Sequence, residues 1–170
     1  MQGKPATLRY GLETGMPRSA PPAGTLAQLT AQGAALVANP ERRVFPGLPM
    51  QLAQVRRFVA RALDGCPVLD EAVLCVSELA SNAIVHTRTG QGGRFEVVVW
   101  RGPGSACVAV IDDGSETRPA PRPSAPGDLA ESGHGLAVVQ NLTACWGHHR
   151  YQDGAWQGAV VWFRIDWSRG

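Results

Sequence analysis

Three polar side chains at intervals of four residues mark the segment "SELASNAIVH" (residues 77–86). Glu78, Asn82 and His86 carry an acid, an amide and an imidazole, and this spacing places them along one side of an α-helix. An acid, an amide and an imidazole on an otherwise apolar helix need hydrogen-bond partners wherever they are buried. The three residues are therefore candidates for a functional stripe. The alternative interpretation is a solvated helix surface, because charged side chains are mostly exposed.

Two glycine-containing motifs follow the stripe along the chain. In "VIDDG" a β-prone run ends in Asp112, Asp113 and Gly114, and "GHGL" runs from Gly133 to Leu136. Asp-Asp-Gly after a strand is typical of a turn. Glycines before a helix let backbone N–H groups approach an anion at the positive end of the helix dipole. Each motif alone is weak evidence for a site, so their order along the chain carries the argument.

The helix that carries the stripe is expected to run from about residue 68 to residue 86. Its apolar residues gather on the side opposite the stripe, at 100° per residue; they are Val73, Val76, Ala80, Ala83 and Ile84. Leu74, Leu79 and Val85 extend the apolar surface around the helix. We therefore expect the stripe to lie in a groove and not on a fully solvated face.

The remaining elements follow from hydrophobic periodicity and from breaks at proline and glycine. We expect a short strand ending at Pro46, an amphipathic helix over 50–63, strands over 94–100 and 106–112 joined by a hairpin, a helix over 133–147, and a strand over 157–167. Residues 114–132 are proline-rich and are interpreted as a lid or flap. This order predicts an α+β fold, a two-layer α/β sandwich with a mixed β-sheet and helices on one face.

Composition separates residues 1–39 from the rest of the chain. This segment is rich in Pro, Gly and Ala and is expected to be a mobile tail, whereas residues 40–168 form one domain. Within the tail, "LAQLTAQGAALVA" (residues 26–38) has apolar spacing that leaves a helix open, although Gly33 destabilises one by about 1 kcal/mol relative to Ala.

Charge and cysteine usage exclude several classes of function. The net charge of +2 comes from scattered Lys and Arg without a basic block, so direct nucleic-acid binding is not expected. Membrane spans and a secretory signal are not expected either, which indicates a cytoplasmic protein. Four cysteines lack metal-ligand spacing and are expected to be reduced core residues; they are Cys66, Cys75, Cys107 and Cys145.

Taken in order, the motifs resemble the ATP-binding (Bergerat) domain of the GHKL proteins. The segments that carry the resemblance are "FPGLPMQLAQVRRFV", "VLCVSELASNAIVHT", "VAVIDDG", "ESGHGLAVVQNLTACWG" and "VVWF". Within that superfamily the chain is most similar to the small stand-alone anti-sigma-factor serine/threonine kinases of the RsbW and SpoIIAB type. Residues 40–168 would accordingly be a HATPase-like ATP-binding domain.

The resemblance implies a role for each residue of the motifs. Glu78 would be the general base, Asn82 would help to coordinate Mg²⁺ on the ATP phosphates, and Asp112 would accept a hydrogen bond from the adenine amino group. Backbone donors at the start of the last helix would meet the phosphates; the residues implied there are Gly133, His134, Gly135 and Leu136. Gly114 would let the adenine edge come close, and His86 would either orient nearby groups or simply end its helix.

The chain also departs from the family pattern. Glu116 replaces the second glycine expected after Asp112, and four prolines occupy the flap in place of a glycine hinge; they are Pro119, Pro121, Pro123 and Pro126. The last strand reads "GAVVW" where many relatives have a threonine near the adenine. We expect altered lid closure and one lost polar contact to the nucleotide.

Two functions of different classes follow from the resemblance. The first is an ATP- and Mg²⁺-dependent protein kinase that phosphorylates a STAS-domain anti-sigma-factor antagonist and otherwise holds a sigma factor. The second is a catalytically silent, nucleotide-gated protein-binding module. A histidine-kinase catalytic domain is disfavoured, because the chain leaves no room for a phosphoacceptor histidine on a dimerising hairpin. A homodimer is an expectation from the resemblance alone.

Overall fold

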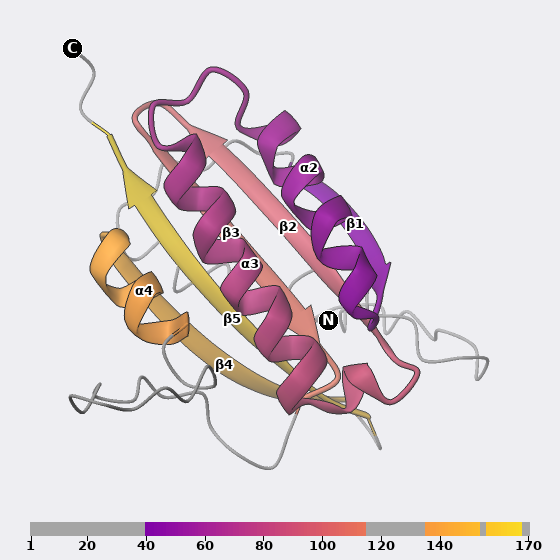
Figure 1. Cartoon of the computed structure of the whole chain (residues 1–170). Coiled ribbons are helices and arrows are strands. Elements are labelled where there is room, and N and C mark those ends of the chain that lie inside the picture. Colours follow the sequence, from indigo (N-terminus) through magenta and orange to yellow (C-terminus); the bar gives the residue numbers. More distant parts are fainter. Residues whose placement is uncertain (1–39, 115–134, 154–155, 168–170) are drawn as a thin grey trace, which may run out of the picture.

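The computed structural model describes residues 40–114, 135–153 and 156–167 (Figure 1). The predictions for the tail, for most of the flap, and for Gly133 and His134 lie outside these residues. Figure 1 shows two layers, with α-helices in front of a single twisted sheet. An α+β fold of this kind is what the order of the motifs predicted.

The sheet contains five strands in the order β1-β2-β3-β5-β4, and all four neighbouring pairs are antiparallel. The strands are β1 (Glu41–Pro46), β2 (Arg94–Gly102), β3 (Ser105–Asp112), β4 (Cys145–Asp153) and β5 (Trp156–Asp166). Every residue of β3 is buried, and so is the central run of β2 from Phe95 to Trp100. Continuous burial of this kind indicates strands that are covered on both faces.

Three α-helices of the described chain pack against one face of this sheet (Figure 1). They are α2 (Leu52–Ala62), α3 (Leu69–His86) and α4 (Gly135–Leu142). Short 3₁₀ turns at Pro49–Gln51 and Arg88–Gly90 precede α2 and follow α3. The ends of α2 and α3 agree with the predicted ones to within two residues.

The main core lies between the helices and the sheet. In α2, Val55, Val59 and Ala62 recur at helical spacing and are buried, and in α3 the buried set includes Val76 and Ala80. These side chains meet alternate residues of the central strands, such as Val97, Val108 and Phe163. The apolar stripes of the two helices therefore determine which face of each strand lies inward.

Two expectations about the sheet and the last helix were wrong. The sheet is antiparallel and not mixed, because β5 returns by a hairpin from β4 and inserts between β3 and β4, which run parallel to each other. The last helix ends at Leu142, since residues from Cys145 onward form β4. The polar run "GHHRYQ" in β4 has neither the alternation nor the β-branched content that makes a strand evident.

The stripe-bearing helix is less enclosed than its composition suggested. Glu78 and Asn82 are half-buried, as a groove requires, but His86 is exposed. Leu74 and Val85, which were expected to help to enclose the stripe, are 45% and 65% exposed. Apolar residues beside the stripe are therefore no guide to its burial; the described contact that covers part of it is that of Glu78 with Gly135 of α4.

The cysteines and the helices of the described chain agree with the predicted core. All four cysteines are free; Cys66, Cys75 and Cys107 are buried, and Cys145 is half-buried. No helix among the described residues is long and apolar enough to cross a membrane.

Candidate functional site

Asp112 is a buried carboxyl group at the last residue of β3. It is 4% exposed, and its Oδ1 accepts a hydrogen bond of 2.6 Å from the backbone N–H of Gly114. Among the described residues no donor meets its other oxygen, Oδ2. Burial raises the pKa of Asp112 from 3.8 to about 7, an effect that the Gly114 hydrogen bond opposes and the nearby charge of Asp113 adds to. Oδ2 is not among the fully buried atoms that lack a partner, so it is open to water or to a ligand that supplies a donor.

Gly114 shapes the loop beside this carboxyl. Its φ is +72°, in the left-handed region that residues with a Cβ rarely adopt. A Cβ at this position would lie 3.3 Å and 3.4 Å from the backbone C and Cα atoms of Gly158 in β5. Ala159 follows and pairs with Asp112 across the strands. The "GAVVW" run, where the expected threonine is missing, therefore forms the side of the site next to Asp112.

A threonine that sequence reasoning missed connects this loop to the end of α3. Thr89 is fully buried; its hydroxyl accepts from Asp113 N at 3.1 Å and donates to Arg94 O at 3.4 Å. The carboxylate of Asp113 accepts in turn from Arg94 N at 3.4 Å. The N–H of Asp113 and the carbonyl of Arg94 would each lose a partner without the hydroxyl, so Thr89 holds the loop that follows β3.

Arg88 adds a second set of contacts between the same two segments. Its backbone N–H donates to Gly114 O at 3.1 Å, and its guanidinium donates to Asp113 O at 3.0 Å and 3.3 Å. The sequence "TRTGQGG" (residues 87–93) is typical of a glycine-rich loop and does not predict these contacts. The feature of the sequence that could have indicated these contacts is the pair of threonines, because hydroxyls near turns often bond backbone groups. Thr87 is an example, since its Oγ1 accepts from Thr89 N at 3.1 Å.

Glu78 and Gly135 bring two of the predicted motifs together. The carboxylate of Glu78 lies against the first residue of α4, so closely that a Cβ on Gly135 would overlap it. The two helices also pack along their lengths. A glycine is needed here for close approach, and the candidate general base consequently sits beside the N-terminus of α4, where a negative charge is favourable.

The other predicted residues occupy separate positions. Asn82 lies one turn after Glu78 on α3 and is half-buried, whereas His86 is the exposed last residue of that helix. Leu136 is 6% exposed and its side chain joins the main core, which leaves only its backbone for a ligand. The structure thus groups Glu78 with Gly135 and Asp112 with Gly114. Helix α3, which carries Glu78, packs against β3, which ends at Asp112.

The fold and these motifs have a counterpart among known families. Residues 45–165 match the model of the histidine kinase-like ATPase domain, which is more than two thirds of the 170 residues. The chain belongs to this family, within the GHKL superfamily. No curated protein matches the chain closely enough to count as a relative. Domains of this family are ATP-binding, regulatory and kinase-like, and they usually bind ATP with Mg²⁺.

Metal binding, if it occurs, requires more than the side chains of the described chain. Among these residues there is no group of three or more His, Cys, Asp or Glu side chains placed to hold a metal ion. The oxygens of Asn82 and Glu78 on one side of α3 are hard donors of the kind that Mg²⁺ prefers. Mg²⁺ keeps several waters and is commonly held by one or two protein oxygens together with substrate phosphates, and this donor set fits such a site.

Proposed function

We propose that the chain binds ATP at this site and acts as an ATP-dependent serine/threonine protein kinase of the anti-sigma-factor type. The observation that carries the nucleotide part is the unpartnered Oδ2 of buried Asp112 beside Gly114. The exocyclic amino group of adenine is a hydrogen-bond donor of the kind that this oxygen lacks. A ligand with such a donor would hydrogen-bond to this oxygen, and we expect the site to favour adenine over a base that presents a carbonyl oxygen there.

The phosphate end of the nucleotide would lie at α3 and α4. Asn82 would supply an amide oxygen to Mg²⁺, and the N-terminus of α4 would face the phosphates. Bound Mg²⁺ would neutralise charge on the transferred phosphoryl group. Glu78, next to Gly135, is then the side chain placed to accept the proton of an incoming serine or threonine hydroxyl.

The partner part of the proposal rests on the resemblance to anti-sigma-factor kinases. A STAS-domain anti-sigma-factor antagonist would be the phosphoacceptor, and a sigma factor would be the protein held in its absence. The compact domain and the presence of both Glu78 and Asn82 support a kinase over a module that only binds nucleotide.

The first test is calorimetric titration of ATP into the full chain with and without Mg²⁺. Wild type is expected to bind in a Mg²⁺-dependent manner. Asp112→Asn should weaken binding by about tenfold or more, because a hydrogen bond to a charged group contributes about 1.5–3 kcal/mol. The matched control is Asp64→Asn, which removes the same charge at an exposed position outside the site. No binding by wild type at millimolar ATP would refute the proposal.

The second test separates the kinase from the silent module. Transfer of ³²P from γ-labelled ATP to purified STAS-domain proteins is expected for wild type and lost in Glu78→Gln, which should still bind ATP. Glu71→Gln, on the same helix near its start, is the matched control. ATP binding with no transfer by wild type to any serine or threonine of these proteins would favour the nucleotide-gated binding module.

A further inference from the structure

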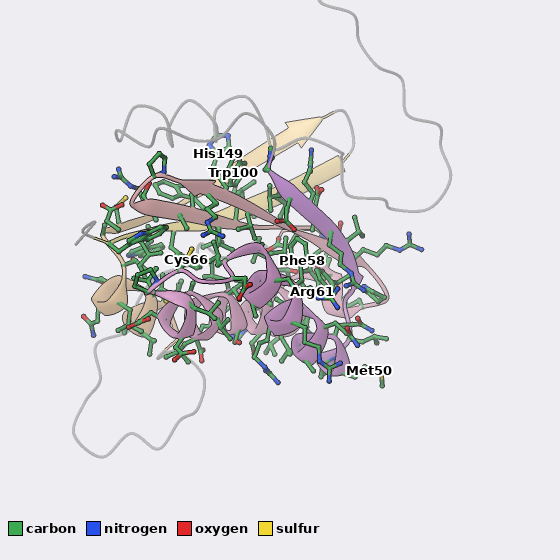
Figure 2. The ribbon with its side chains drawn as sticks, turned by 90° about the horizontal axis from the view of Figure 1, so that it is seen from above. Met50, Phe58, Arg61, Cys66, Trp100 and His149 are labelled. Carbon is green, nitrogen blue, oxygen red and sulfur yellow. The ribbon has the colours of Figure 1, made fainter. Side chains whose placement is uncertain are left out.

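The sheet face opposite the helices carries a second apolar cluster. We call it the outer face and define it by alternate residues of the three central strands. The apolar members are Val98, Trp100, Cys107, Ala109, Ile111, Val160 and Trp162. Glu96 precedes them on β2 with the same orientation. Figure 2 shows the labelled Trp100 on the side of the sheet away from Phe58 and Arg61 of α2.

The outer face is buried although no described helix lies on it. The seven apolar residues are 0–2% exposed within a single chain, and the cluster includes no residue of α2, α3 or α4. A sheet face that is open to water would leave such side chains accessible. Burial of this degree is typical of a sheet face that is covered by a further layer.

Two buried polar atoms on this face also lack a partner. Arg42 donates to Glu96 Oε1 at 2.8 Å, but Glu96 Oε2 and Trp162 Nε1 have no hydrogen-bond partner among the residues that the structure describes. Glu96 is 3% exposed and Trp162 is 2% exposed. Buried polar groups are usually satisfied. The segment that covers the face should therefore be apolar and also carry side chains that can donate to a carboxylate and accept from an indole N–H.

Of the two longer segments outside the described residues, 1–39 and 115–134, the chain connectivity favours residues 1–39. Residues 115–134 start at Gly114 and end at Gly135, and both of these belong to the site on the helix side. Residues 154–155 and 168–170 are too short. Residues 1–39 lead directly into β1, an edge strand whose Arg42 contacts Glu96 on the outer face.

The sequence of residues 26–38 matches what the outer face lacks. If this segment is helical, with 100° per residue, its large apolar side chains fall on one side within about 100°; they are Leu26, Leu29, Leu36 and Val37. Gly33 would lie near the middle of this apolar side, where it permits close packing. Thr30 and Gln32 would lie at its two edges. Thirteen residues of helix span about 20 Å, and the five strands are about 19 Å across from first to last.

We propose that residues 26–38 form an amphipathic helix that docks on the outer face of the sheet. Leu26, Leu29 and Leu36 would pack on the apolar cluster, and Thr30 and Gln32 would supply the polar partners. The helix makes the sheet a middle layer, and it closes the outer face to a second copy of the chain. The interaction is independent of the proposed nucleotide site.

The test uses two buried cysteines of the full chain as reporters. Cys107 lies on the outer face and Cys75 lies in α3, and both are fully buried. N-ethylmaleimide labelling of native protein, followed by peptide mass spectrometry, measures each thiol separately. The double variant Leu29→Asp/Leu36→Asp should raise the labelling rate of Cys107 at least roughly tenfold through local opening, and leave that of Cys75 unchanged.

The matched control, Gln28→Asp/Ala35→Asp, adds the same charges on the opposite side of the predicted helix. It should label like wild type, in which Cys107 is protected at every protein concentration. An equal effect of both double variants on Cys107, or no effect of either, would overturn the proposal. Protection of Cys107 that disappears on dilution would show that a second copy covers the face instead.

A second measurement covers the case in which the aspartate variants unfold and expose both thiols. A photoreactive benzoylphenylalanine at position 29, in a mixture of ¹⁴N and ¹⁵N chains, should crosslink to peptides of β2, β3 or β5 within one isotope. Crosslinks of mixed isotope would assign the face to a second copy. Crosslinks only to the helix side of the sheet, or none, would place residues 26–38 elsewhere.

Discussion

Replacing Asp112 by Asn should stabilise the fold and weaken nucleotide binding at the same time. The side chain is 4% exposed, and burial raises its pKa to about 7 from an ordinary value of 3.8. Above pH 7 the folded protein therefore holds a buried negative charge that the unfolded chain holds in water. Asn keeps the size and the acceptor for the Gly114 N–H but carries no charge.

The magnitude follows from the difference between the two pKa values. At about 1.36 kcal/mol per pKa unit, the rise in the pKa of Asp112 from 3.8 to about 7 corresponds to about 4 kcal/mol of stability. Between these pH values the folded state binds more protons than the unfolded state, so the contribution of Asp112 to stability falls as pH rises through this window. The stability gain of the variant should be near zero at pH 4 and approach about 4 kcal/mol at pH 8.

Urea unfolding of wild type and Asp112→Asn at pH 4, 5, 6, 7 and 8 measures this difference, because the pH dependence of all other groups is common to both proteins. Asp64→Asn, at an exposed position, should differ little from wild type at every pH. A stability difference that does not grow with pH, or a variant that is less stable at pH 8, would refute the argument that Asp112 is an uncompensated buried charge.

Three further substitutions test the contacts around the site. Thr89→Val should lower the free energy of unfolding by about 1–3 kcal/mol, because it leaves the buried N–H of Asp113 without an acceptor; Thr89→Ser should recover most of it in urea unfolding. Gly135→Ala should displace Glu78 and reduce phosphoryl transfer, although alanine alone favours a helix by about 1 kcal/mol; normal transfer would show that their contact is unimportant. Ala159→Thr should place a donor beside the buried carboxyl and lower its pKa in a carboxyl-carbon NMR titration, because a hydrogen bond to the charged form favours that form; an unchanged pKa would show that the hydroxyl does not reach Asp112.

Local pattern predicted the two long helices, which have an apolar side, and the two central strands, which are continuous apolar runs. The ends of α2 and α3, the hairpin of β2 and β3, and the placement of helices on one face could all be read from periodicity and breaking residues. The strand β4 could not be predicted from its own sequence. Its nine residues are polar in places where a typical strand is apolar, and they become a strand by pairing with β5.

The sequence alone determined which residues are chemically suited to a nucleotide site: an acid and an amide one helical turn apart, a carboxyl at a strand end, and glycines before a helix. Only the tertiary structure decided how they are supported. Thr89 reaches Asp113 across 24 positions of sequence, and Gly135 meets Glu78 from a different helix. Periodicity reports which side of an element faces inward, but it contains no information on which distant residue fills the space there. That choice is made by packing and by the need of each buried polar group for a partner.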